Sequence, residues 1–404
     1  MKKGVTADEA INIMLAQPVN KKTEIVSVSD AFGRVLTEDI YAQEMVPPFD
    51  RSPFDGYAFR GEDTAGATQE HPVILSMTEE IPAGNVPTLE VTAGKAAKIL
   101  TGAPIPRGAN ATIKYESTEF SDNEVKIFSP IAPNKDIVPA GEDIAMGDLI
   151  ASAGTVISPP VMGMLASVGV AAVCVYLRPV ITVISTGTEL IEADAPAIPA
   201  KIRNSSFYTL SGYLYENGST VRNGGIVVDN PDLIAEKIRA ELNHSDLVIT
   251  TGGVSVGDYD WVVTAVEKLG AEVLFWKVGK KPGGSMMVAV LDGKLILGLS
   301  GNAVSAVMGL MQVAMPYIRK LCGRTDLLPP MIEVMLKESF NQECHAMRLL
   351  RGRLEFEAGG AYLSQCKSQG HGVISALMGC NLLGEIPAES SPLPAYTKIK
   401  AFRM

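Results

Sequence analysis

The sequence is poor in cysteine and in positive charge, and both shortages exclude classes of protein. Among 404 residues there are five cysteines, an odd number without any CxxC pair. Their wide spacing argues against a disulfide framework and a zinc knuckle, and it favours a reducing compartment such as the cytoplasm. The formal net charge of -10 argues against nucleic-acid binding, which needs a basic face to neutralise phosphates.

The sequence also lacks an apolar run that reads as an export signal or a membrane span. The start, MKKGVTADEAINIML, places acidic residues where a signal peptide has its continuous apolar segment. Two charge-free stretches, 156–177 and 295–318, have the length of a membrane span. Each divides into a helix and a strand around Pro or Gly residues, so we expect a cytoplasmic protein without membrane contact.

The chain is long enough for several domains, and its local patterns divide it into four parts. Strands and helices alternate through the third part, which predicts a three-layer α/β domain with a mostly parallel sheet. The predicted fold class is therefore α/β plus β, with an inserted small β domain and a C-terminal β-barrel. The expected parts are 1–45 plus 140–177 (helical and linking), 46–139 (inserted, β-rich), 178–325 (α/β) and 326–404 (barrel).

The densest chemical signal is SDLVITTGGVSVGDYD, a buried strand that runs into a Gly-rich loop before a helix. Such a loop lets backbone N–H groups approach a phosphate. Two carboxylates at the same place suit a phosphate accompanied by Mg²⁺, although Asp258 is equally well explained as a helix N-cap. The loop residues of interest are Gly252, Gly253, Ser255, Gly257, Asp258 and Asp260.

Two further carboxylates follow predicted strands of the same domain. Glu189 follows a Ser-Thr-Gly turn, and Asp229 follows the strand GGIVV. Alone, Glu189 reads as a capping or solvated residue, and Asp229 reads as a cap for the helix that Pro231 begins. The position of Glu189 at a strand end of the same domain favours a shared site, whereas the cap is the preferred interpretation of Asp229.

A run of lysines, WKVGKKPGG, ends another strand and continues into a tight Pro-Gly-Gly loop. A charge run is usually a solvated face, but the tight loop favours a clamp for a phosphate or another oxyanion. The segment Ser300-Gly301-Asn302 follows the next strand and opens a helix, which is also suited to an anion. Outside the α/β part, three loops (47–58, 101–104 and 141–143) carry acidic residues or turn motifs, and each alone reads as an ordinary turn.

Seven motifs occur in one order over most of the chain: FDRSPFDGYA, ILTGAPIPRGA, AGEDI, STGTEL, TTGGVSVGDYD, KVGKKPG and GLSGN. Together they resemble the molybdopterin molybdenumtransferase family, which comprises the bacterial molybdenum-insertion enzymes and the E domain of gephyrin. One motif, TTGGVSVGDYD, is shared with the adenylyltransferases of the same pathway, whereas the ordered set is specific. The resemblance implies an enzyme that cleaves adenylylated molybdopterin with a divalent metal such as Mg²⁺, releases AMP and ligates molybdate to the dithiolene.

The resemblance also implies a homodimer, with a cleft between the α/β domain of one subunit and the β domain of the other. The pathway's adenylyltransferase is the implied transfer partner. By motif position, the implied metal ligands are Asp55, Asp143, Glu189, Asp229 and Asp260, and the implied catalytic residues are Asp55, Thr101, Asp143, Asp260, Lys277 and Lys281. The expected substrate-binding set is Gly252, Gly253, Ser255, Gly257, Asp258, Pro282, Gly283, Ser300, Gly301, Asn302, Arg351 and His371.

The chain departs from the family pattern around the expected oxyanion pocket. Family members usually have Pro at the positions of Ser300 and Ala303, a basic residue at Gly284 and Ser at His371. Two hypotheses therefore remain beside the prediction of a molybdenumtransferase. One is a divergent relative that handles tungstate, and the other is a gephyrin-like scaffold protein without activity.

Overall fold

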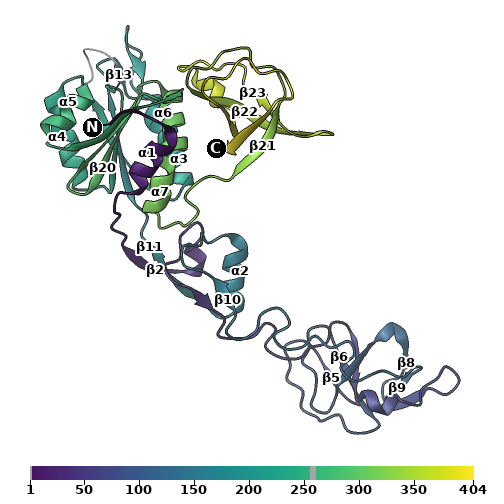
Figure 1. Ribbon diagram of the computed structural model, residues 1–404. Coiled ribbons are helices and arrows are strands. Elements are labelled where there is room, and N and C mark those ends of the chain that lie inside the picture. The colour runs from purple at the N-terminus through teal and green to yellow at the C-terminus, as the bar shows by residue number, and fades with distance from the viewer. Residues whose placement is uncertain (1, 255–260) are drawn as a thin grey trace.

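The computed structural model describes residues 2–254 and 261–404 and shows an elongated molecule (Figure 1). An α/β lobe and a β-barrel lobe lie side by side at one end, and a narrow middle part leads to a small β unit at the other end. The expected fold class is confirmed. None of the helices in the described part of the chain has the length and apolar character that a membrane crossing requires.

The α/β lobe is built on a seven-stranded sheet in the order β1-β17-β19-β20-β16-β12-β15. β19 runs antiparallel to both its neighbours and the other pairs are parallel, so the sheet is mostly parallel as predicted. The strands are β1 (Lys2–Val5), β12 (Val180–Thr186), β15 (Thr220–Val227), β16 (Leu247–Thr251), β17 (Glu272–Val278), β19 (Met286–Leu291) and β20 (Lys294–Leu299).

Helices cover both faces of this sheet, because its central strands are apolar on both sides. One core joins the sheet to α1 (Ala7–Leu15), α3 (Ser205–Glu216), α6 (Ala303–Gly309) and α7 (Met315–Leu321). A π-helix, η4 (Leu310–Ala314), connects the last two. The core on the opposite face joins α4 (Pro231–Leu242) and α5 (Trp261–Lys268) to the sheet.

Residues 2–15, which we expected in the linking part, instead belong to the α/β lobe. β1 pairs with β17, and the fully buried Ala10 and Met14 of α1 lie in the same core as the sheet. A capping box begins α1, because Thr6 Oγ1 accepts from Glu9 N (3.2 Å) and Thr6 N donates to Glu9 Oε2 (2.8 Å). Local sequence sets the start of this helix, but long-range strand pairing assigns the segment to a different core.

The chain passes through the narrow middle part twice, which makes the distal β unit an insertion. Two antiparallel pairs hold the passes together: β2 (Thr23–Ser27) with β11 (Ala172–Tyr176), and β3 (Ile40–Tyr41) with β10 (Leu149–Ala151). Helix α2 (Pro159–Ser167) packs beside them. The distal sheet has the order β7-β4-β6-β5-β9-β8. Its strands are β4 (Gly56–Phe59), β5 (Val73–Ile81), β6 (Lys95–Ile99), β7 (Ala111–Lys114), β8 (Thr118–Phe120) and β9 (Glu124–Ile127).

The C-terminal lobe is a closed barrel of five strands, as the β-rich texture of the sequence predicted. Pairing runs β22-β23-β21-β25-β24 and returns from β24 to β22. The two-residue strand β18 (Lys280–Lys281) leaves the α/β lobe and adds to the barrel alongside β22. The barrel strands are β21 (Met331–Leu336), β22 (Met347–Glu357), β23 (Gly360–Gln365), β24 (Leu382–Ile386) and β25 (Lys398–Arg403).

Candidate active site

A cavity of about 730 Å³ opens at the carboxyl ends of the parallel strands in the α/β lobe. Ligands bind at this edge in open α/β sheets, since the loops that follow the strands converge there. The structure brings together at this cavity seven of the residues that the sequence predicted. They are Glu189, Asp229, Gly252, Gly253, Ser300, Gly301 and Asn302.

The two carboxylates of the cavity lie on loops that hydrogen bonds join. Asp229 Oδ2 accepts from Thr188 N (3.2 Å) and Thr188 Oγ1 (3.3 Å), so the loop after β12 is tied to the loop after β15. The carboxylate of neighbouring Glu189 forms no hydrogen bond within residues 2–254 and 261–404. The capping interpretation of Asp229 is wrong, because the N-cap of α4 is Asn230, whose Oδ1 accepts from Asp232 N and Leu233 N.

The glycines of the loop after β16 allow a close approach between backbones. Gly252 and Gly253 have φ of 99° and 62°, values that L side chains rarely adopt. A Cβ on Gly252 would lie 2.5 Å from the carbonyl oxygen of Thr186, and a Cβ on Gly301 would lie 3.4 Å from the Cα of Gly252. The two anion-suited loops therefore touch. The predicted residues Ser255, Gly257, Asp258 and Asp260 lie outside the described residues.

The lysine run at the end of β17 divides into residues with different surroundings. Lys277 has φ of 70°, and its Nζ lies 4.7 Å from the centre of the Trp276 ring. The Trp276 Nε1 donates to Val254 O (3.4 Å), immediately before the undescribed part of the Gly-rich loop. Lys280 is buried, whereas the next residue, Lys281, is exposed. The two predicted substrate lysines, Lys277 and Lys281, are thus the partly or fully exposed members of the run.

The loop after Lys281 is closely packed against α6. Pro282 and Gly283 are buried, and a Cβ on Gly283 would lie 2.7 Å from Gly309 N. A Cβ on Gly284, where the family resemblance predicts a basic residue, would lie 2.3 Å from Lys280 O. The backbone path of this turn therefore accounts for glycine at position 284 in this chain.

The barrel lines part of the α/β cavity through a loop that a buried arginine holds. Arg351 is fully buried, and its Nη2 donates to Ser368 O and Gly370 O, both at 3.2 Å. Its Nε and Nη1 are buried without a hydrogen-bond partner in the described part of the chain. The arginine thus holds the loop that carries His371. Gly372 of the same loop lines the α/β cavity.

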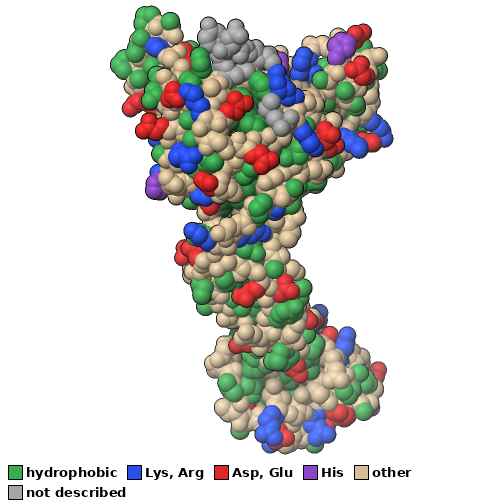
Figure 2. All heavy atoms as spheres, turned by 60° about the vertical axis from the view of Figure 1, so that its left-hand side comes forward, with side chains coloured by type: hydrophobic (Ala, Val, Ile, Leu, Met, Phe, Trp, Pro, Cys, Tyr) green, Lys and Arg blue, Asp and Glu red, His purple; other side chains and the backbone are tan. Residues whose placement is uncertain are grey.

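His371 lies among cations. Partial burial lowers its pKa, and three charged neighbours lower it further. These neighbours are Arg348, Arg351 and Lys281. Figure 2 shows basic side chains gathered at the notch between the two upper lobes. Sequence reasoning missed Arg348, although the strand register places it directly beside Lys281.

The three loops outside the α/β part, each unremarkable alone, form one cluster on the distal unit. Backbone hydrogen bonds join Ser52 to Gly102 and Ala103, and join Pro47 to Gly141. Asp55 Oδ1 accepts from both the backbone N and the Oγ1 of Thr101, each at 2.7 Å. These two hydrogen bonds lower the pKa of Asp55, so its carboxylate is charged at neutral pH.

The five acids predicted as metal ligands are not brought together within one chain. Asp55 and Asp143 lie on the cluster of the distal unit, and Glu189 and Asp229 lie at the α/β cavity (Figure 1). Within residues 2–254 and 261–404 no group of three His, Cys, Asp or Glu side chains is arranged to hold a metal. Asp260 lies outside those residues.

Comparison with known proteins assigns this architecture to a class. Residues 5–169 match the MoeA N-terminal region (domain I and II), and residues 182–320 match the probable molybdopterin-binding domain. The protein is therefore of the class that joins a MoeA-type N-terminal region to an α/β molybdopterin-binding domain.

Relatives along the whole chain define the family. The molybdopterin molybdenumtransferase of Staphylococcus epidermidis is 33% identical over 95% of this chain and 91% of its own length. The enzyme of the same name from Staphylococcus aureus is 32% identical over 96% of this chain and 92% of its own length. The solved structure of the molybdopterin biosynthesis moeA protein from Pyrococcus horikoshii OT3 superposes with a TM-score of 0.85 and 30% identity, over 99% of this chain and 100% of that one. The chain belongs to the molybdopterin molybdenumtransferase family, an enzyme family of molybdenum cofactor biosynthesis, and these relatives give no support to the scaffold alternative.

Proposed function

We propose that this enzyme cleaves adenylylated molybdopterin, releases AMP and ligates molybdate to the dithiolene sulfurs. The observation that carries the proposal is the α/β cavity, where two carboxylates and two Gly-rich loops meet. A basic barrel surface adjoins it through the loop of His371 and Gly372. A pyrophosphate with a metal would bind between the carboxylates and the lysines, and an oxyanion would bind at the basic surface.

The chemistry of the carboxylates fits Mg²⁺. Asp55 is exposed and charged, and its Oδ2 forms no hydrogen bond within the described residues, so one oxygen is available as a ligand. Glu189 is also exposed at the mouth of the cavity. Mg²⁺ is held by one or two carboxylates together with substrate phosphates, and when bound it would neutralise and polarise the pyrophosphate. Asp143, Asp229 and Asp260 complete the acids that we assign to this role.

The chain's own residues have separate tasks in this proposal. The loops at Gly252 and Gly301 position the phosphates through backbone N–H groups. Lys277 and Lys281 bind the pyrophosphate from the strand end beside the barrel. Arg351 acts by holding the His371 loop toward the molybdate, and its two unpartnered nitrogens, Nε and Nη1, favour an anion nearby.

We also propose that the active enzyme is a homodimer. The Asp55–Thr101 pair and the α/β cavity lie at opposite ends of the elongated chain (Figure 1). A second copy that places its distal unit at the cavity would complete the set of acids. The five free cysteines suit a reducing compartment, and we place the enzyme in the cytoplasm with the pathway's adenylyltransferase as the source of substrate.

The activity is tested by mixing the purified protein with adenylylated molybdopterin, Mg²⁺ and molybdate. We expect AMP release together with metal-loaded cofactor, and replacement of molybdate by tungstate measures the preference between the two oxyanions. A protein that binds the substrate but releases no AMP under any of these conditions would contradict the proposal.

The shared site is tested by complementation between two inactive variants. Asp55→Ala removes an acid of the distal unit, and Glu189→Ala removes one of the α/β cavity. Random mixing gives half mixed dimers with one intact site each, so activity should return to about a quarter of the wild-type level. Activity that stays absent after subunit exchange, when exchange is shown by native mass spectrometry, would place both acids in the same subunit's site.

A further inference from the structure

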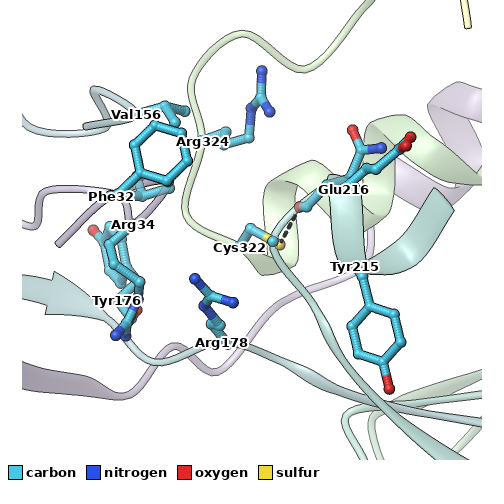
Figure 3. A pocket seen from close by; sticks show the side chains of 13 residues that line it. Phe32, Arg34, Val156, Tyr176, Arg178, Tyr215, Glu216, Cys322 and Arg324 are labelled. Carbon is cyan, nitrogen blue, oxygen red and sulfur yellow. Dashed lines mark hydrogen bonds between the residues drawn. The ribbon is translucent and has the colours of Figure 1, made fainter. Parts of the chain in front are cut away.

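A second cavity, of about 260 Å³, lies where the middle part of the molecule joins the α/β lobe. We call it the joint pocket. It shares no lining residue with the α/β cavity, and the two lie at opposite ends of α3, a helix of 12 residues that is about 18 Å long. Its lining residues come from separate parts of the chain: Phe32–Val35, Val156, Tyr176 with Arg178, Tyr215–Gly218, and Cys322 with Arg324 (Figure 3).

One wall of the joint pocket is a buried arginine with unused donors. Arg34 is 8% exposed, and its Nη2 donates to Glu24 Oε1 and to Tyr176 O (2.9 Å). Its Nε is buried without a hydrogen-bond partner among the described residues. Because this N–H is closed off from solvent, Arg34 acts on an anion in the adjacent cavity through its charge, which the ion pair with Glu24 partly offsets.

A second guanidinium, that of Arg178, points toward the same cavity. Arg178 extends between Tyr176 and Cys322 in Figure 3, and it forms no hydrogen bond or ion pair within the described residues. Arg324 also lines the cavity, but its guanidinium is held by Asp326, with its Nε 2.8 Å from Oδ1, and it points away from Arg178 (Figure 3). Glu216 is the one acidic side chain among the lining residues, and its carboxylate points away from Arg178 (Figure 3).

The rest of the lining is largely aromatic and apolar, with Asn217 as a further polar residue. Phe32 is 60% exposed beside the cavity, so its ring is accessible to a ligand. The ring of Tyr176 packs directly against Gly323, where a Cβ would lie 2.0 Å from the ring. The pocket therefore offers aromatic side chains next to Arg178 and Arg34.

We propose that the joint pocket binds a small phosphomonoester, with the phosphate between Arg178 and Arg34 and the apolar part against Phe32. Arginine forks match the geometry of phosphate oxygens and form the stronger, charge-assisted hydrogen bonds. The volume of the joint pocket is slightly below the range of pockets for drug-sized ligands. The ligand is therefore limited to about one ring, one phosphate and a few further atoms. The site is independent of the proposed transfer reaction, because it is built from other residues.

The test is calorimetric titration with two probes, inorganic phosphate and phenyl phosphate. All titrations use the full chain carrying Lys281→Gln, which weakens anion binding at the α/β cavity. We expect one phenyl phosphate per chain, bound more tightly than inorganic phosphate. Adding Arg178→Gln should weaken both probes by about 10- to 100-fold, the effect of losing a hydrogen bond to a charged group.

Two further variants complete the design. Arg403→Gln removes an exposed arginine of the barrel and should change neither affinity. Phe32→Ala should reduce the preference for phenyl phosphate while leaving the affinity for inorganic phosphate unchanged. Arg178 is exposed, so we expect its variant to unfold at the same temperature as its parent. Absence of saturable binding for both probes, or equal binding with Arg178→Gln present, would overturn the proposal.

Discussion

We expect molybdate affinity to depend on pH through His371, which stands where the family resemblance predicts serine. A neutral imidazole donates one hydrogen bond, whereas the protonated ring donates two and adds a positive charge. Burial and the neighbouring cations lower the pKa of His371, so the free enzyme has a neutral imidazole at neutral pH. A bound oxyanion offsets those cations and favours the protonated ring. The complex therefore takes up a proton, and affinity rises as the pH falls.

The size of the effect follows from the exposure of the side chain. A hydrogen bond to a charged group contributes about 1.5 to 3 kcal/mol when it is shielded from water. His371 is only partly buried on its Gly-flanked loop, so solvent screening reduces that contribution. We expect about 1 kcal/mol, or roughly a fivefold gain in molybdate affinity, between about pH 8 and about pH 6.

The measurement is equilibrium binding of dilute molybdate to the wild type and to His371→Ser over this pH range. The serine variant should show a flatter profile, because serine does not titrate. His345→Gln is the matched control, since His345 is an exposed histidine of the same barrel near Glu389. Parallel curves for the wild type and His371→Ser would refute the reasoning and show that the imidazole points into solvent.

Three other predictions concern residues with defined surroundings. Lys281→Ala should weaken substrate binding by about 2 to 5 kcal/mol, measured by titration, and binding within threefold of wild type would assign the lysine to a solvated face. Thr101→Val should raise the pKa of Asp55 toward its ordinary value, because it removes one of the two donors that lower it. The pH at which activity falls on the acidic side of the pH–activity profile should then rise. An unchanged pH of this fall would exclude Asp55 from the reaction. Burial lowers the pKa of Lys280 to about 7, so between that pH and its usual pKa the unfolded state binds more protons and stability should rise with pH. Lys280→Met should remove that rise in the free energy of unfolding, measured by denaturant titration at several pH values. An unchanged dependence of the unfolding free energy on pH would contradict the burial of Lys280.

Local sequence patterns predicted most of the helices and strands, while long-range strand pairing determined which domain some of them join. The capping box at Thr6 and the helices that begin at Pro159 and Pro231 are set by local sequence, because caps and turns depend on neighbours in sequence. The assignment of β1 to the α/β sheet depends on pairing with residues some 270 positions away, for which the first five residues carry no signal. Likewise the separation of Asp55 from Glu189 is a property of domain placement. Motif order predicts that both serve one reaction, but not which copy of the chain supplies each.

The lysine run around β18 contains a buried lysine and an exposed lysine, and the residue type alone does not tell which is which. Successive side chains of a strand point to opposite faces, so β18 buries Lys280 and exposes Lys281. Lys280 Nζ donates to Met308 O and Gln312 Oε1, both at 2.9 Å, and Gln312 Nε2 donates to Glu385 Oε1 at 2.8 Å. This buried chain links the π-helix of the α/β lobe to β24 of the barrel. The position of Lys281 beside the basic residues of the barrel therefore depends on its buried neighbour, Lys280. The lysine proposed to bind phosphate and the hydrogen bonds that hold the two lobes together thus belong to the same short strand.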